Sequence, residues 1–99
     1  MLMTVLEARV LPDKWATLRS AWADQSSLRR PPQLRESFLT QAVADRELWR
    51  IVSIWPDRAA LDEMRRLEPV PGGVLIFRAA GAEPSLSVFE VTAHLPTIG

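Results

Sequence analysis

The chain has 99 residues, of which 47% are hydrophobic and 24% charged, and this predicts a single folded domain, residues 1–99. Twelve basic and twelve acidic residues cancel, which leaves no charged surface of the kind that binds nucleic acid or an anionic membrane. The chain has no cysteine, one histidine (His94), no bilayer-spanning apolar run and no basic leader, so we expect a cytoplasmic protein without disulfides or a zinc site.

Residues 2–10 predict a strand, because small or apolar side chains alternate with a more mixed set. One face is small and apolar, as expected beneath a helix, and carries Thr4, Leu6, Ala8 and Val10. A helix is expected after the turn at Pro12, with an apolar stripe formed by Trp15, Leu18 and Trp22. It should weaken at residues 25–27 and stop before Pro31, since the residue before a proline resists helical dihedrals.

Residues 34–43 and 47–55 predict two strands, and the short connection between them favours a hairpin. The second of these strands has one face formed by Trp49, Ile51, Ser53 and Trp55 and another formed by Leu48, Arg50, Val52 and Ile54. Both faces are largely apolar, which is typical of an interior strand that is covered on both sides.

A second helix is expected after Pro56, because the side chain of Asp57 can accept a hydrogen bond from an early backbone N–H. Its buried stripe should consist of apolar residues at helical spacing, namely Ala60, Leu61, Met64 and Leu67. On the exposed side, Asp62 and Arg66 are four residues apart and are expected to form a weak ion pair.

Residues 68–73 contain two prolines and two glycines and cannot continue that helix. The pattern leaves the state of the short apolar run 74–78 open, and residues 86–93 predict the last strand. The order of elements predicts an α+β, ferredoxin-like βαββαβ fold, with a four-stranded antiparallel sheet and helices on one face. The other face carries Met3 and Val5, and such an open apolar face predicts a homodimer that packs sheet against sheet.

The segment W-R-I-V-S-I-W-P-D-R-A-A-L-D-E-M resembles the antibiotic biosynthesis monooxygenases, a family of dimeric α/β barrels. That family shows an apolar strand ending in Trp, a small turn and an Ala-Leu helix, matched here by Trp55, Asp57, Ala59, Ala60 and Leu61. The start of the chain resembles the family's first strand and helix through Glu7 and Pro12, and residues 89–91 resemble its last strand. The resemblance implies a dimer that closes as an α/β barrel.

The family includes cofactor-free oxygenases of polycyclic phenols and haem-degrading enzymes. Its oxygenases often carry an Asn four residues before the Trp, where this chain has Ile51, and its haem degraders bind iron through a helical His, near which this chain has Met64, Arg65 and Arg66. The resemblance therefore implies a cofactor-independent monooxygenase of an aromatic phenol or quinone-type substrate, with no haem or other cofactor. The missing Asn and His favour an altered chemistry or the alternative, a non-catalytic dimer that binds a small hydrophobic ligand or a protein.

The candidate catalytic residues are Trp55, which can stack on an aromatic substrate and place a carbonyl or dioxygen with its indole N–H, and Glu7, which can accept a phenol or enol proton. The candidate substrate contacts are Trp22, Trp49, Arg50, Ile51 and Leu61. These candidate residues also have purely structural interpretations. The tryptophans can be core residues. The charged strand residues can form cross-strand ion pairs, and this applies to Glu7, Arg9, Arg50 and Glu90. His94 can lie exposed or at a subunit contact, and the pairs at 29–30 and 65–66 are interpreted as solvated faces.

Overall fold

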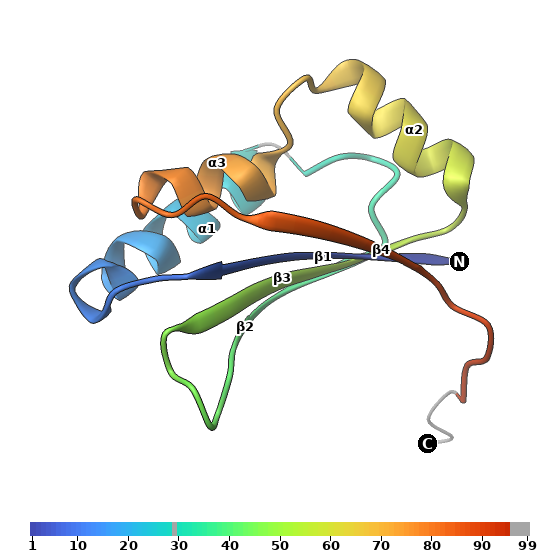
Figure 1. The fold of residues 1–99 in the computed structure, drawn as a ribbon. Helices are drawn as coiled ribbons and strands as arrows, with labels where there is room; N and C mark the ends of the chain where they lie inside the picture. Colours follow the sequence, from blue (N-terminus) through green and yellow to red (C-terminus); the bar gives the residue numbers. More distant parts are fainter. Residues whose placement is uncertain (29, 96–99) are drawn as a thin grey trace.

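The computed structural model describes residues 1–28 and 30–95 of the chain (Figure 1). Its elements are β1 (Leu2–Arg9), a 3-10 helix η1 (Pro12–Lys14), α1 (Trp15–Leu28), β2 (Glu36–Gln41), β3 (Leu48–Trp55), α2 (Arg58–Leu67), α3 (Gly72–Ala79) and β4 (Ser85–Glu90). The strands pair antiparallel in the order β2-β3-β1-β4, and the helices lie on one side of the sheet. The predicted α+β, ferredoxin-like arrangement is therefore confirmed. Within these residues, no helix is both long and apolar enough to cross a membrane.

The two faces of the sheet follow the alternation of the sequence. Thr4 lies opposite Ser53 on the face beneath the helices, whereas Val5 lies opposite Val52 on the open face. The predicted interior strand is β3, which is paired on both sides. The open face carries a continuous set of apolar side chains, namely Met3, Val5, Phe38, Val52, Ile54 and Phe89. None of the helices that the structure describes covers this apolar face, and the segment after β4 passes to that side (Figure 1).

The apolar core is divided into two clusters. The larger one includes Leu18 of α1 and Phe77 of α3, both 0% exposed, packed with Trp49 and Ile51 of the sheet. The smaller one is formed by Trp55, Leu61 and Met64, with Leu2 and Leu34 packed against it. Helix α2 is therefore anchored to the sheet separately from α1 and α3.

Helix α2 begins where its cap was predicted. The Oδ1 atom of Asp57 accepts a hydrogen bond of 2.8 Å from the backbone N–H of Ala60. Leu61 and Met64 are buried, but Leu67 is 54% exposed, so its assignment to the buried stripe is wrong. The helix ends at Leu67, and its last turn has no core beneath this side chain.

The predicted Asp62–Arg66 ion pair is also wrong. Arg66 instead holds Glu63 through two hydrogen bonds of 3.0 and 2.6 Å, and Asp62 lies 3.4 Å from Arg58. Residues three apart are also neighbours on a helix surface, and the planar guanidinium gains by meeting both carboxylate oxygens.

The run 74–78, whose state the sequence pattern left open, belongs to a third helix, α3, which follows Pro71. Two glycines in the first turn of so short a helix are locally unfavourable. Burial outweighs this, because Ile76 and Phe77 are 4% and 0% exposed. Gly73 also has a packing reason: a Cβ atom there would lie 2.5 Å from Cδ1 of Leu6, so its absence lets the helix approach the sheet closely.

Three elements differ from the sequence-based expectation by more than one residue. Helix α1 continues through residues 25–27, where it was expected to weaken, and the Ser26 hydroxyl donates to the carbonyl of Ala23 within the helix at 3.2 Å. Strand β2 spans Glu36–Gln41 in place of residues 34–43, and Leu34, before it, packs against the smaller core cluster. Strand β4 spans Ser85–Glu90 in place of residues 86–93.

The turn after α3 allows a simple test of backbone conformation. Gly81 has φ of 74°, so Gly81→Ala should lower the free energy of unfolding by about 1–2 kcal/mol. The same change at Gly72 is a matched control, since its added Cβ would meet Gln25 at an ordinary 3.6 Å and α3 gains a better helix former. Urea unfolding followed by circular dichroism measures both. Equal midpoints for the two variants would argue against a left-handed Gly81.

Candidate ligand cavity between the sheet and the helices

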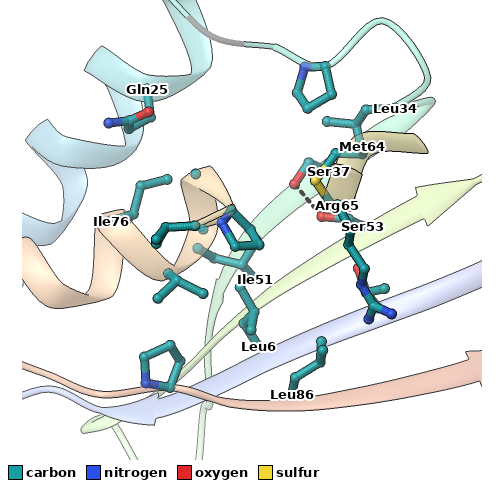
Figure 2. A pocket seen from close by; sticks show the side chains of 18 of the residues that line it. Leu6, Gln25, Leu34, Ser37, Ile51, Ser53, Met64, Arg65, Ile76 and Leu86 are labelled. Carbon is teal, nitrogen blue, oxygen red and sulfur yellow. Dashed lines mark hydrogen bonds between the residues drawn. The ribbon is translucent and has the colours of Figure 1, made fainter. Parts of the chain in front are cut away.

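A cavity of about 540 Å³ lies between the sheet and the helices. Its lining includes Ile51 and Ile76 from the larger core cluster and Trp55, Leu61 and Met64 from the smaller one, so it occupies the space where the two clusters face each other. Figure 2 shows part of these walls, with Ile51 on a strand and Ile76 and Met64 on the helices. This volume is within the range of small-molecule sites, which run from about 300 to 1,000 Å³.

Three hydroxyl side chains from neighbouring strands also line the cavity: Thr4, Ser53 and Ser37, here called the hydroxyl row. They are adjacent because Thr4 lies opposite Ser53 in the β1–β3 register, and Ser37 lies opposite Ser53 in the β2–β3 register. The Oγ atoms of Ser37 and Ser53 are 2.9 Å apart and share a hydrogen bond, dashed in Figure 2. The row is a polar strip beside apolar side chains of the same sheet face, such as Leu6 and Ile51.

Trp55 supports this strip. Its side chain is 4% exposed, and its Nε1–H donates to Oγ1 of Thr4 at 3.0 Å. The indole N–H is thus engaged within the protein, and the ring is what Trp55 presents to the cavity. Because the Thr4 oxygen accepts this bond, its own hydrogen is left for another acceptor, and the serine pair likewise uses one of its two hydrogens internally. Within the described residues, two hydroxyl donors are therefore available to a ligand.

Three of the expected substrate contacts line the cavity with Trp55, namely Trp22, Ile51 and Leu61. Trp49 differs from the expectation. It is 3% exposed and packs edge-on against Trp15 with ring centroids 6.0 Å apart, while the guanidinium of Arg19 lies 5.4 Å from its ring. Trp49 is thus a core residue beneath α1, as its structural alternative held.

Glu7 and Arg50 also lie apart from the cavity. They are cross-strand partners on the open face, where Nε of Arg50 donates to Oε1 of Glu7 at 2.6 Å. Arg9 makes a similar ion pair with Asp45, with a hydrogen bond of 3.2 Å. Within one chain the sheet separates Glu7 and Arg50 from the cavity, which differs from the expectation that they meet the substrate and matches the ion-pair alternative.

The charged residues of the lining are three arginines and one glutamate: Arg30, Arg65, Arg78 and Glu83. Glu83 accepts hydrogen bonds of 3.0 and 2.8 Å from Arg78, and this contact holds the pKa of the Glu83 carboxyl below its usual range. A carboxylate with a lowered pKa is a weak base, so Glu83 is poorly suited to proton abstraction. No cluster of His, Asp or Glu suited to a metal ion occurs within residues 1–28 and 30–95.

Gln25 and the hydroxyl row are polar lining residues that the sequence analysis did not select. The Oε1 atom of Gln25 is buried and has no hydrogen-bond partner in the part of the chain that the structure describes. Figure 2 places Gln25 on α1, across the cavity from Ser37 and Ser53. The cavity is thus lined by an amide side chain from α1 and by hydroxyl donors from the strands. Strand alternation placed Thr4 on the face expected beneath a helix and Ser53 on one face with Trp55, but only the register brings Thr4 and Ser53 together.

No protein-family model and no curated protein matches the sequence. Solved structures do match. SnoaB, a cofactor-independent oxygenase from Streptomyces nogalater, is 19% identical over 97% of both chains, with a TM-score of 0.71. A candidate antibiotic biosynthesis monooxygenase from Deinococcus radiodurans is 12% identical over 100% of both chains, with a TM-score of 0.73. Another from Nitrosomonas europaea is 12% identical over 94% of this chain and 100% of that chain, with a TM-score of 0.69. The chain therefore has the fold of the antibiotic biosynthesis monooxygenases, as its sequence resemblance predicted.

Proposed function

We propose that the protein is a cofactor-independent monooxygenase that binds an aromatic phenol or quinone-type substrate in the cavity. One observation carries this proposal: an apolar cavity of about 540 Å³, walled by Trp55 and crossed by the hydroxyl row, in a fold shared with SnoaB. Apolar walls and an indole ring favour a flat aromatic ring system, and a few fixed polar groups orient its oxygen substituents.

In this proposal the substrate supplies the reactive electrons. A phenol or enol that loses its proton becomes an electron-rich anion, and a ring carbon of this anion forms a bond to dioxygen. The resulting hydroperoxide loses water, so that one oxygen atom stays on the ring as a new carbonyl and the other leaves as water. The protein excludes water, fixes the ring and offers hydroxyl hydrogens from Thr4 and the serine pair to the negatively charged oxygen. Donors held in place before the reaction stabilise such an oxygen more effectively than water does. Glu7 has no part in this scheme, because it lies on the open face of the sheet.

The second candidate function is a binding protein with the same cavity and no turnover. The observation in its favour is the state of Glu83, the carboxylate among the described lining residues, which Arg78 already holds. A site that lacks a free general base can bind an aromatic ligand without converting it. Oxygen consumption separates the two functions, since a binding protein saturates with ligand and consumes none.

We also propose that the protein is a homodimer formed through the open face of the sheet. Phe38 and Phe89 on this face are 49% and 52% exposed in the single chain. Apolar side chains extend across all the strands of this face, and two such faces can cover each other. The cavity lies on the helical side, so each subunit would keep its own.

The proposed oxygenase activity is tested by variants that remove a hydroxyl of the row or the indole N–H that hydrogen-bonds to it. Trp55→Phe and Thr4→Val should each lower oxygen consumption with a panel of polycyclic phenols by about tenfold or more, because each disrupts a positioned donor. Trp15→Phe is the matched control, since Trp15 is outside the cavity lining and donates to the Val10 carbonyl instead. An oxygen electrode and ligand absorbance are recorded together. Wild-type turnover by Trp55→Phe would overturn the role of Trp55, and saturable binding without oxygen uptake would favour the binding protein.

A further inference from the structure

Arg65 differs from the other arginines that line the cavity. Arg78 is held by Glu83 at 2.8 Å, and Arg30 donates to the backbone carbonyl of Arg35 at 3.0 Å. For Arg65, which is half-buried, the structure has no hydrogen bond or ion pair with any described residue. It is thus a fixed positive charge within the lining that lacks a counter-charge in the described chain.

The neighbouring Arg66 differs from Arg65, which shows that the lack of a partner depends on the position in α2 and not on the residue type. Arg66 is bound to Glu63, and its side chain is 68% exposed. Successive residues of a helix point about 100° apart, so one of the two arginines faces solvent and the other faces the sheet. Figure 2 shows the side chain of Arg65 extending from α2 into the cavity toward the strands. The interpretation of this pair as a solvated face therefore holds for Arg66 alone.

A half-buried guanidinium beside apolar walls has lost part of its hydration, and this is costly unless an acceptor replaces the water. Arginine keeps its charge at any physiological pH and presents several N–H donors in one plane. The hydroxyl row adds donors from the strands, whereas the one carboxylate of the described lining is already paired. Three arginines and one glutamate also make the lining positive, although the whole chain has a formal net charge of zero.

We infer that Arg65 and the hydroxyl row form a subsite for a negatively charged oxygen, so that the cavity takes an acidic aromatic phenol or enol as its anion. The inference rests on the proposed function for the substrate class, but the binding of the anion requires no turnover. The ligand releases its proton to solvent, and the positive lining favours the ionised form. This arrangement would explain how an oxygenase can work with no free carboxylate in its described lining.

The test compares two ligands with the same ring system. The enol 2-hydroxy-1,4-naphthoquinone ionises readily, whereas 2-methoxy-1,4-naphthoquinone cannot ionise, and both are already quinones and serve as binding probes. Tryptophan-fluorescence quenching should show tighter binding of the hydroxy compound to the wild-type protein. Arg65→Gln should weaken that binding about 10- to 100-fold, the range for a hydrogen bond to a charged group, and leave the methoxy compound nearly unchanged.

Arg66→Gln is the matched control, because it removes the same charge from the same helix and should leave both affinities as in the wild type. Arg65→Lys keeps the charge but loses the planar donors, so it should retain part of the preference, which a misfolded variant would not. Three results would overturn the inference: equal wild-type affinities for the two probes, equal losses in Arg65→Gln and Arg66→Gln, or no binding of the hydroxy compound.

Oxygen consumption with the phenol panel is recorded separately on the same proteins, so that the inference and the proposed function can fail independently. A preference for the anion without any oxygen uptake supports the subsite and counts against the oxygenase. Unchanged oxygen uptake by Arg65→Gln, together with unchanged affinity for the hydroxy compound, supports the oxygenase and overturns the subsite.

Discussion

Phe77→Ala should lower the free energy of unfolding by about 3–5 kcal/mol, in the range found for large-to-small changes at fully buried aromatic positions. Phe77 is 0% exposed and lies in α3, where it belongs to the larger core cluster with Leu18 and Trp49. Its replacement leaves a void between α3, α1 and the sheet, which these packed elements cannot fill without moving. Domains of this size are stable by only about 5–15 kcal/mol, so the variant should lose a large part of its stability.

The matched control is Phe38→Ala, because Phe38 lies on the open face and is 49% exposed. Urea titrations followed by far-ultraviolet circular dichroism give both values. They are made at the lowest practical protein concentration, so that any association through the open face contributes least to the stability of the control. An equal loss for the two variants would contradict the buried placement of α3.

Val5→Asp should convert the proposed dimer into a monomer. Val5 lies on the interior strand β1, beside Val52 of β3 on the open face, and Phe38 of β2 lies next to Val52. A second sheet packed on this face would enclose the new carboxylate without a partner, and such burial costs several kcal/mol. Sedimentation velocity should give twice 11.1 kDa for the wild-type protein and 11.1 kDa for the variant.

Val43→Asp makes the same chemical change at a residue that is 85% exposed in the loop between β2 and β3, outside the paired strands, and should leave the dimer intact. Circular dichroism of both variants shows whether the single chain still folds. A wild-type mass of 11.1 kDa at micromolar concentration would exclude the proposed dimer. A dimeric Val5→Asp protein would move the interface to another surface.

Local signals in the sequence were sufficient for the strands and for the start of α2. Alternation correctly separated Thr4 from Val5, and the Asp57 cap forms as predicted. Helix α3 was not predicted, because its glycines and the preceding Pro71 count against a helix when only neighbouring residues are considered. Its stability comes from burying Phe77 against segments that are distant in the sequence, and no local pattern contains that information.

The candidate site was predictable in its apolar part and not in its polar part. Trp55 and Ile51 share a strand face, so their common placement follows from alternation alone. The hydroxyl row depends on the relative register of the strands, and the inward direction of Arg65 depends on how α2 is rotated over the sheet. Neither the strand register nor the rotation of α2 can be predicted from residues that are neighbours in the sequence. Alternation did place Glu7 on the face opposite Thr4, which is where the structure has it.

The division of the core into two clusters has a consequence for the folded state itself. The space between the clusters is also the cavity, so a bound aromatic ligand would act as an additional core residue that joins α2 to α1 and α3 through the ligand's own rings. Ligand and protein would then share one continuous apolar interior. Occupancy and conformational stability are thereby coupled, since any molecule that binds the native state alone stabilises it by mass action. A ligand that filled the space between the two clusters would complete the apolar core of the protein.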